Sequence, residues 1–143
     1  MAGLTAVLVS GCGTDDERPS IASVPLAPGL VVDAEHYECI EVGLCGQNLI
    51  IRGDSDSSAD SLLNREVSAL RRGGWEVRRS NRFPPLEADS PNGRLHLTLA
   101  TARGMVDEFA QRGVPWDEKL AAKLRAVSGG RTAALAGSLE SDR

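Results

Sequence analysis

The stretch of residues 95–100, LHLTLA, restricts the fold more than any other part of the sequence, because leucine occupies every second position. Successive side chains of a β-strand point to opposite faces, so this alternation predicts a strand with one buried face. Such a strand needs further strands and a covering layer to bury its leucines. The same alternation places His96 on the opposite, solvent-facing side.

A helix is predicted between two capping signals earlier in the chain. Ser57 or Ser58 suits its start, and Gly73 suits the residue that follows its end. The apolar residues Leu63, Val67 and Leu70 share one face of this helix, with Ala59 and Leu62 beside them.

The remaining elements complete an α+β domain. Residues 47–52 and a segment that begins at Trp75 read as strands, whereas residues 81–93, with three prolines, read as a loop. We therefore expect a small, mostly antiparallel sheet with one main packed helix, in the order strand-helix-strand-strand, plus C-terminal helices. These last helices are predicted from two apolar patterns: Met105, Val106 and Phe109, ending at Gly113, and then Trp116, Leu120, Leu124 and Val127, entered at Pro115.

The overall composition argues against some classes of partner. The net charge is −4, which is unfavourable for binding nucleic acid. Aromatic residues make up 3% of the chain, and sugar or base recognition usually relies on aromatic platforms. We expect no nucleic acid partner and no cofactor.

The first nine residues, 1–9, are apolar or small apart from one threonine, and the run is too short to span a bilayer. It ends in Val9-Ser10-Gly11-Cys12, which resembles the lipobox of bacterial lipoproteins. The resemblance implies cleavage before Cys12 and attachment of a diacylglyceryl group to its sulfur. The alternative is a native N-terminal strand that buries Cys12 in a cytosolic protein. Since no basic residue precedes Arg18, we expect the natural start to lie further upstream.

The lipobox interpretation divides the chain into four parts. Residues 1–11 would be a signal peptide, and residues 12–28, polar with three prolines, a flexible tether on the lipid anchor. Residues 29–128 would form the α+β domain with its C-terminal helices, and residues 129–143 a disordered tail. The expected location is the outer face of the cell membrane.

Cys39 and Cys45 are expected to form a disulfide, because two cysteines outside the cytoplasm most often pair. Two alternatives remain open. His36, Cys39 and Cys45 could ligate zinc, with His96 or a carboxylate as the fourth ligand, and in the cytosol the two cysteines would be free thiols.

The segment Ile51 to Ser55, IRGDS, resembles the Gly-Asp-Ser block of GDSL-type hydrolases, in which the serine is the nucleophile. That family also needs an Asp-x-x-His near the C-terminus, which this chain lacks. A minimal hydrolase would use Ser55 or a carboxylate among Asp54, Asp56 and Asp60. The alternative is a purely structural role, as a polar loop that caps the following helix.

The same aspartates fall at alternate positions, as in a calcium-binding loop. However, Ala59 stands where that loop needs glycine, and Arg65 stands where it needs glutamate. We expect no calcium site, and we assign no catalytic or metal-binding residue.

Arginine makes the middle of the chain locally basic. This basic segment could contact an anionic polymer or lipid headgroups, although a solvated surface is the simpler interpretation. The sequence thus predicts a membrane-anchored envelope lipoprotein that acts as a non-enzymatic binding or accessory module, with an envelope protein or an anionic polymer as possible partner. The arginines concerned are Arg65, Arg71, Arg72, Arg78, Arg79 and Arg82.

Overall fold

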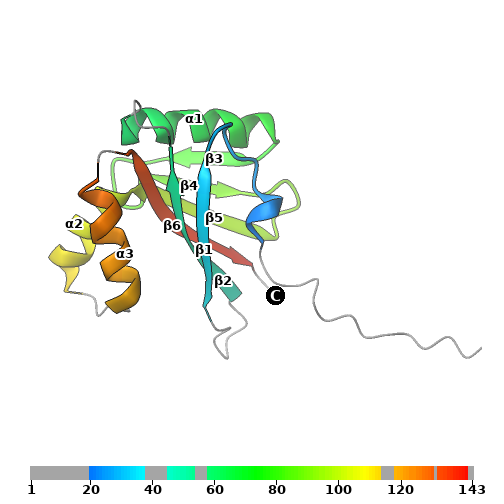
Figure 1. Ribbon diagram of the computed structural model, residues 1–143. Coiled ribbons are helices and arrows are strands. Elements are labelled where there is room, and N and C mark those ends of the chain that lie inside the picture. The colour runs from blue at the N-terminus through cyan, green and yellow to red at the C-terminus, as the bar shows by residue number, and fades with distance from the viewer. Residues whose placement is uncertain (1–19, 38–44, 54–57, 114–117, 131, 142–143) are drawn as a thin grey trace, which may run out of the picture.

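The computed structural model describes residues 20–37, 45–53, 58–113, 118–130 and 132–141. They form an α+β domain built on one antiparallel sheet of six strands, in the order β1-β2-β6-β5-β4-β3, which confirms the predicted fold class (Figure 1). In chain order the elements are a 3₁₀ helix (Ile21–Ser23), β1 (Val31–Tyr37), β2 (Cys45–Arg52), α1 (Ala59–Arg72), β3 (Glu76–Arg79), β4 (Leu86–Asp89), β5 (Leu95–Thr101), α2 (Ala102–Arg112), α3 (Glu118–Ser128) and β6 (Ala134–Ser141).

The main core lies between α1 and one face of the sheet. Ser58, one of the two serines predicted to cap the start of α1, is its N-cap residue. The Ser58 hydroxyl accepts a hydrogen bond from the Ser61 amide at 3.1 Å. The apolar face of α1 packs on alternate residues of β2, β4, β5 and β6, as the alternation in residues 95–100 requires. The fully buried members include Leu49, Ile51, Leu62, Leu70, Leu86, Leu97, Leu99, Leu135 and Leu139.

Gly73 follows the end of α1 as predicted, but the glycine with the left-handed conformation lies one residue later. Gly73 has a φ of −78°, and Gly74 is the residue with the left-handed φ of 81°. The amide of Gly74 donates to the carbonyl of Arg71, and that of Trp75 donates to Leu70. Gly74 therefore turns the chain away just after the helix, because glycine adopts positive φ without a steric penalty.

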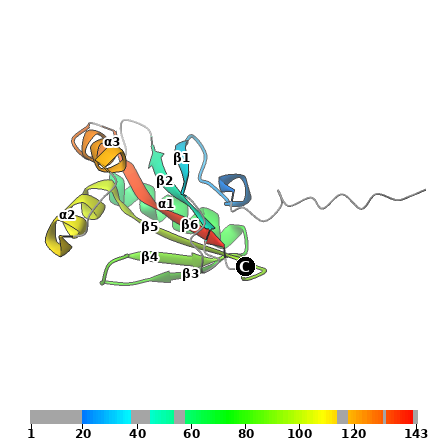
Figure 2. The ribbon, with the colours of Figure 1, turned by 90° about the horizontal axis from the view of Figure 1, so that it is seen from below.

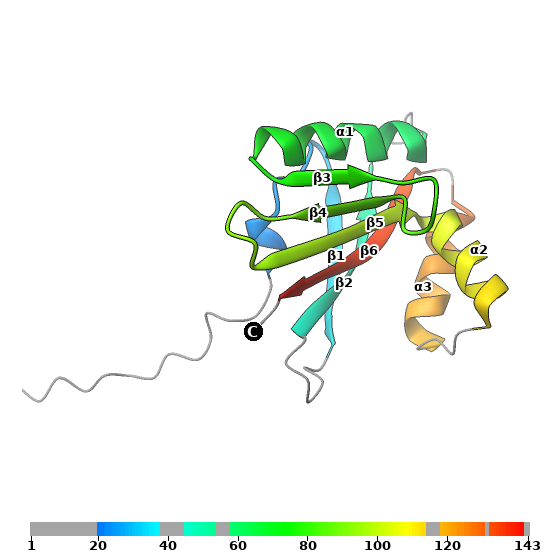
Figure 3. The same cartoon turned by 180° about the vertical axis from the view of Figure 1, so that it is seen from behind.

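The C-terminal segment 129–143, expected to be a disordered tail, instead supplies β6. This strand lies in the middle of the sheet, with β2 on one side and β5 on the other (Figure 3). Leu135 and Leu139 are fully buried on the α1 side. Burial of these leucines and pairing on both edges outweigh the weak strand propensity of the small residues around them.

The expected tether, residues 12–28, is also ordered in part, since residues 20–28 pack against the domain. The amide of Ala27 donates to Glu66 Oε2 at 2.9 Å, and Arg65 Nη2 donates to the carbonyl of Pro28 at 2.8 Å. Glu66 and Arg65 both belong to α1, so this helix holds the segment of residues 20–28 against the domain. The domain therefore begins before residue 29.

Glu66 is the one ionisable side chain that the described part of the chain buries completely. Its Oε2 accepts from Ala27, whereas Oε1 has no hydrogen-bond partner. Burial raises the pKa of Glu66, and the Ala27 amide and Arg65 oppose this shift.

Besides β6, two further strands were not predicted. Residues 81–93, expected to be a loop, contain β4, in which Leu86 and Ala88 are buried. Pro84 and Pro85 stand before this strand and Pro91 after it, so the prolines bound β4 rather than interrupt it. The other unpredicted strand is β1, which pairs with β2 at the edge of the sheet.

The second face of the sheet is covered only in part. Helices α2 and α3 lie together beside one end of it, while α1 occupies the other face (Figure 2). α2 ends at Gly113 with a φ of 62°, as predicted. A small second core forms under the two helices from Ile50, Ala102, Leu124, Ala134 and Ala136.

Candidate functional site

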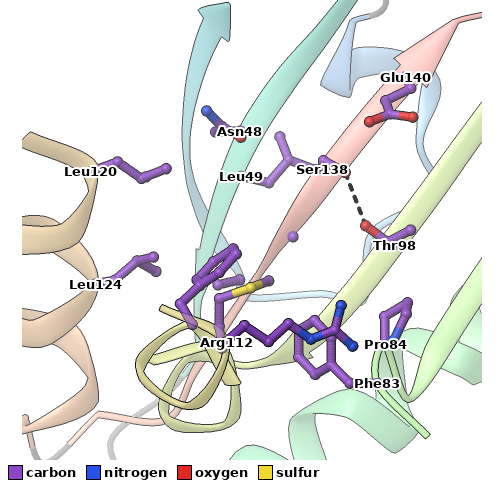
Figure 4. A pocket seen from close by; sticks show the side chains of 14 residues that line it. Asn48, Leu49, Phe83, Pro84, Thr98, Arg112, Leu120, Leu124, Ser138 and Glu140 are labelled. Carbon is purple, nitrogen blue, oxygen red and sulfur yellow. Dashed lines mark hydrogen bonds between the residues drawn. The ribbon is translucent and has the colours of Figure 1, made fainter. Parts of the chain in front are cut away.

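A cavity of about 500 Å³ lies where α2 and α3 stand against the second face of the sheet (Figure 4). This volume is typical of sites that hold small organic molecules. Its lining comes from the two helices, from the connection between β3 and β4, and from the middle strands β2, β5 and β6.

The helices supply an apolar wall. Leu120 and Leu124 are four residues apart on α3, and Met105 and Phe109 have the same spacing on α2, so each pair shares one helical face. Figure 4 shows the two leucines pointing from α3 into the cavity. Phe83 and Pro84, between β3 and β4, add further apolar surface.

The sheet supplies a polar floor. Asn48 of β2 lies opposite Ser138 of β6, which in turn lies opposite Thr98 of β5. The hydroxyls of Thr98 and Ser138 are 2.9 Å apart and hydrogen-bonded (dashed in Figure 4). Because the side chains of directly paired residues on one face are neighbours, these three form one row across three strands.

Gly137 allows these strands to approach closely. A Cβ atom at this position would lie 1.8 Å from the carbonyl oxygen of Thr98. Only glycine is therefore compatible with the backbone geometry that brings Thr98 and Ser138 together.

Charged residues extend the floor away from the helices. In the next row, Glu140 of β6 pairs with His96 of β5, and His96 pairs with Asp89 of β4. His96 Nδ1 is 2.7 Å from Asp89 Oδ1, and Arg78 Nη1 donates to Asp89 Oδ2 at 2.6 Å. The hydrogen bond with His96, and then the one with Arg78, lower the pKa of Asp89 below its ordinary value.

The Asp89–His96 pair has the form of the orienting half of a catalytic triad, in which a carboxylate fixes the imidazole. However, His96 Nε2 faces Glu87 Oε1 at 3.7 Å, and the hydroxyls of Thr98 and Ser138 bond to each other. Within the described residues, this geometry gives no hydroxyl nucleophile activated by His96. The Thr98–Ser138 and Asp89–His96 pairs are two hydrogen-bonded pairs on the open face of the sheet.

Arg112, the last residue of α2, also lines the cavity. It forms an ion pair with Glu108, one helical turn earlier. Its charge is therefore balanced within α2.

The predicted site residues are elsewhere or outside the described residues. Cys12, Cys39, Ser55, Asp54 and Asp56 all lie outside them, so lipidation, the disulfide and the serine nucleophile stay predictions. Two others are placed only as backbone: Cys45 begins β2 and His36 lies in β1, opposite Gln47.

Asp60 is exposed in the first turn of α1, on the far side of the sheet from the cavity. The arginine cluster is divided between the two faces: Arg79 donates to Asn64 of α1 at 2.5 Å, whereas Arg78 donates to Asp89 on the open face. His96 lies on the face away from α1, as the alternation predicts, but is bonded to Asp89.

Sequence reasoning did not find the floor of the cavity. Asn48, Thr98 and Ser138 are separated by long stretches of sequence, and only strand register brings them together. One local signal exists for β6: Leu139 stands between the polar residues Ser138 and Glu140.

In comparisons with known proteins, no family model matches this chain, and neither a curated protein nor a solved structure matches it. In the described part of the chain, no helix has the length and apolarity required to cross a bilayer. No group of three or more His, Cys, Asp or Glu residues suited to a metal ion occurs among those same residues.

Proposed function

We propose that this protein is a membrane-anchored cell-envelope lipoprotein whose domain is a non-enzymatic binding module for a small amphipathic molecule. The observation that carries the binding part is the cavity of about 500 Å³ between the α2–α3 pair and the sheet. Its size suits an organic ligand, and its lining combines an apolar wall with a few convergent polar groups.

The lining supports an amphipathic ligand rather than a purely polar one. Leu120 and Leu124 face the floor residues Thr98 and Ser138 across the cavity (Figure 4). A molecule with an apolar part against the leucines and a polar part on the hydroxyls leaves neither kind of group without a suitable neighbour. Burying polar floor groups under a purely apolar ligand would cost their hydration without replacing it.

The anchored location is supported by the lipobox-like sequence Val9-Ser10-Gly11-Cys12 and the polar segment after it. A lipid on Cys12 would keep the domain at a membrane surface, where amphipathic molecules concentrate. Binding and anchoring are independent properties of the chain and are tested separately.

Binding is tested with N-phenyl-1-naphthylamine, a neutral amphipathic dye whose fluorescence rises in apolar surroundings. We expect saturable binding to the wild-type protein. Met105→Trp should lose binding, because the indole ring is larger than the methionine side chain and fills the cavity. Gln111→Trp is the matched control, since it adds the same ring at an exposed position of α2. Equal binding by all three proteins would refute the cavity as the site.

Anchoring is tested by metabolic labelling with a clickable fatty acid in bacterial cells that express the gene with its own upstream region. The wild-type protein should be labelled and fractionate with membranes, and Cys12→Ser should lose both properties. Full labelling of Cys12→Ser would overturn the lipid anchor without affecting the binding test.

A further inference from the structure

The polar floor of the cavity contains one side chain whose hydrogen-bonding groups are unused. Asn48 of β2 is half-buried and lines the cavity beside Ser138 of the paired strand β6 (Figure 4). Within the described residues, the side-chain amide of Asn48 makes no hydrogen bond, whereas the hydroxyls of Thr98 and Ser138 bond to each other at 2.9 Å. The hydrogen-bonding groups of this amide are therefore available to a ligand in the cavity.

The three floor residues together offer both donors and acceptors, and none of them is charged. The Asn48 amide has two N–H donors and a carbonyl oxygen that accepts. The bond between Thr98 and Ser138 uses one of their two O–H groups, so one O–H donor remains. A head group that can only accept would cover the Asn48 carbonyl without giving it a donor, which costs the hydration of that oxygen. The floor therefore matches a head group that donates and accepts at the same time.

The charged residues that line the cavity do not favour a charged ligand. The described lining contains one arginine, Arg112, and one glutamate, Glu140, so the formal charges of the lining cancel. Arg112 is also paired with Glu108 of its own helix. An ammonium or a carboxylate would lose hydration in the cavity without meeting an excess of opposite charge.

We propose, on the basis of the proposed function, that the cavity selects a neutral amphiphile with a primary amide head group, and that Asn48 determines this specificity. The ligand N–H donates to the Asn48 carbonyl, and the ligand carbonyl accepts from the Asn48 N–H. A primary amide holds its donor and acceptor side by side in one plane, as asparagine does, so both bonds form at once. The apolar part of the ligand lies against Leu120 and Leu124, over Ile50 and Ala136, which are one step of about 6.6 Å along their strands from the polar row.

The test compares decanamide with N,N-dimethyldecanamide, which keeps the carbonyl but has no N–H donor. Decylamine and decanoate, of the same chain length, carry opposite charges at pH 7. Binding is measured by displacement of N-phenyl-1-naphthylamine, below the concentration at which each compound forms aggregates. We expect decanamide to bind about ten-fold more tightly than N,N-dimethyldecanamide, as expected for one lost hydrogen bond to a covered carbonyl, and more tightly than either charged compound.

The variant Asn48→Leu should bind the two amides about equally, because leucine has a similar branched shape and makes no hydrogen bonds. Direct binding of the dye by this variant shows that the cavity is intact, and Asn48→Ala gives the same comparison if leucine blocks the dye. Asn64→Leu is the matched control, because it removes an amide from an exposed position of α1 on the opposite side of the sheet and should keep the preference. A preference that survives in Asn48→Leu and Asn48→Ala, or that is lost equally in Asn64→Leu, would overturn the inference.

The two proposals fail in different ways. Equal binding of the two amides to the wild-type protein, or tighter binding of decylamine or decanoate than of decanamide, would overturn the amide inference and leave the cavity as a binding site. Failure of all four compounds and of the dye to bind would overturn the proposed function itself.

Discussion

Substitution of Gly137 by alanine should destabilise the protein severely, because β6 and β5 leave no space for a Cβ atom there. The added carbon would lie 1.8 Å from the Thr98 carbonyl oxygen and 2.9 Å from Leu99 Cδ2, whereas real Cβ contacts are essentially never under 3.0 Å. The Thr98 oxygen belongs to the backbone of a central strand, so relief requires the two strands to separate by roughly 1 Å.

The expected cost can be built from two contributions. Overpacking of a tightly packed site costs about 1–3 kcal/mol, and weakening an adjacent hydrogen bond of the β-ladder costs about 1 kcal/mol more. We therefore expect Gly137→Ala to lower the free energy of unfolding by about 3 kcal/mol, a large part of the 5–15 kcal/mol that is typical of a domain. The corresponding fall in Tm is about 10 °C for a chain of this size.

The assay is urea unfolding followed by tryptophan fluorescence and circular dichroism. Gly129→Ala is the matched control, because a Cβ atom there would lie 3.5 Å from the Arg125 carbonyl oxygen, an ordinary contact. The control should change stability by less than about 0.5 kcal/mol. A Gly137→Ala protein as stable as this control would refute the close packing of β6 against β5.

Three further predictions concern single side chains. Leu139→Ala should cost about 2–5 kcal/mol in urea unfolding, because Leu139 is fully buried; a change below 0.5 kcal/mol would mean that β6 is not part of the core. Glu66→Gln should gain stability relative to the wild-type protein as pH rises from 5 to 9. The pKa of Glu66 is raised in the folded state, so the wild-type protein loses stability as Glu66 ionises. Parallel stability profiles of the two proteins against pH would contradict this prediction. The pKa of Asp89 is lowered in the folded state, so the stability that its carboxylate contributes is present above its unfolded pKa and is lost as pH falls through its folded pKa. Asp89→Asn should therefore lose less stability than the wild-type protein as the pH is lowered. An equal loss in both proteins would exclude a stabilising role of the Asp89 carboxylate.

Local periodicity was sufficient to predict the elements that make the main core. The apolar spacing of α1 and the alternation of β5 are both properties of short windows of sequence, and the structure confirms them. Their burial follows from the pattern itself, because each has one apolar face that water disfavours.

The strand β6 could not be predicted in the same way. Its sequence, ALAGSLES, is rich in small residues whose intrinsic preference for a strand is weak. What makes it a strand is pairing with β2 on one side and β5 on the other, and these partners are far away in sequence. Gly137, which looks like a mark of a flexible tail, is instead required by the close approach of Thr98.

The candidate site was unpredictable for the same reason. Asn48, Thr98 and Ser138 carry no motif, and each is an ordinary polar residue within its own strand. Strand register aligns them in one row, and the α2–α3 pair covers only part of that face, so the three residues line a cavity. The residues that did form recognisable motifs, Cys12 and Ser55, lie outside the described residues, so those predictions stand untested.

The most direct test of the cavity as a ligand site is a titration of the ¹⁵N-labelled protein with 1-decanol, followed by backbone amide chemical shifts. The account predicts saturable shifts concentrated in α2, α3 and the facing residues Asn48, Thr98 and Ser138, with α1 unaffected. Shifts scattered over the surface, or concentrated on α1, would contradict it.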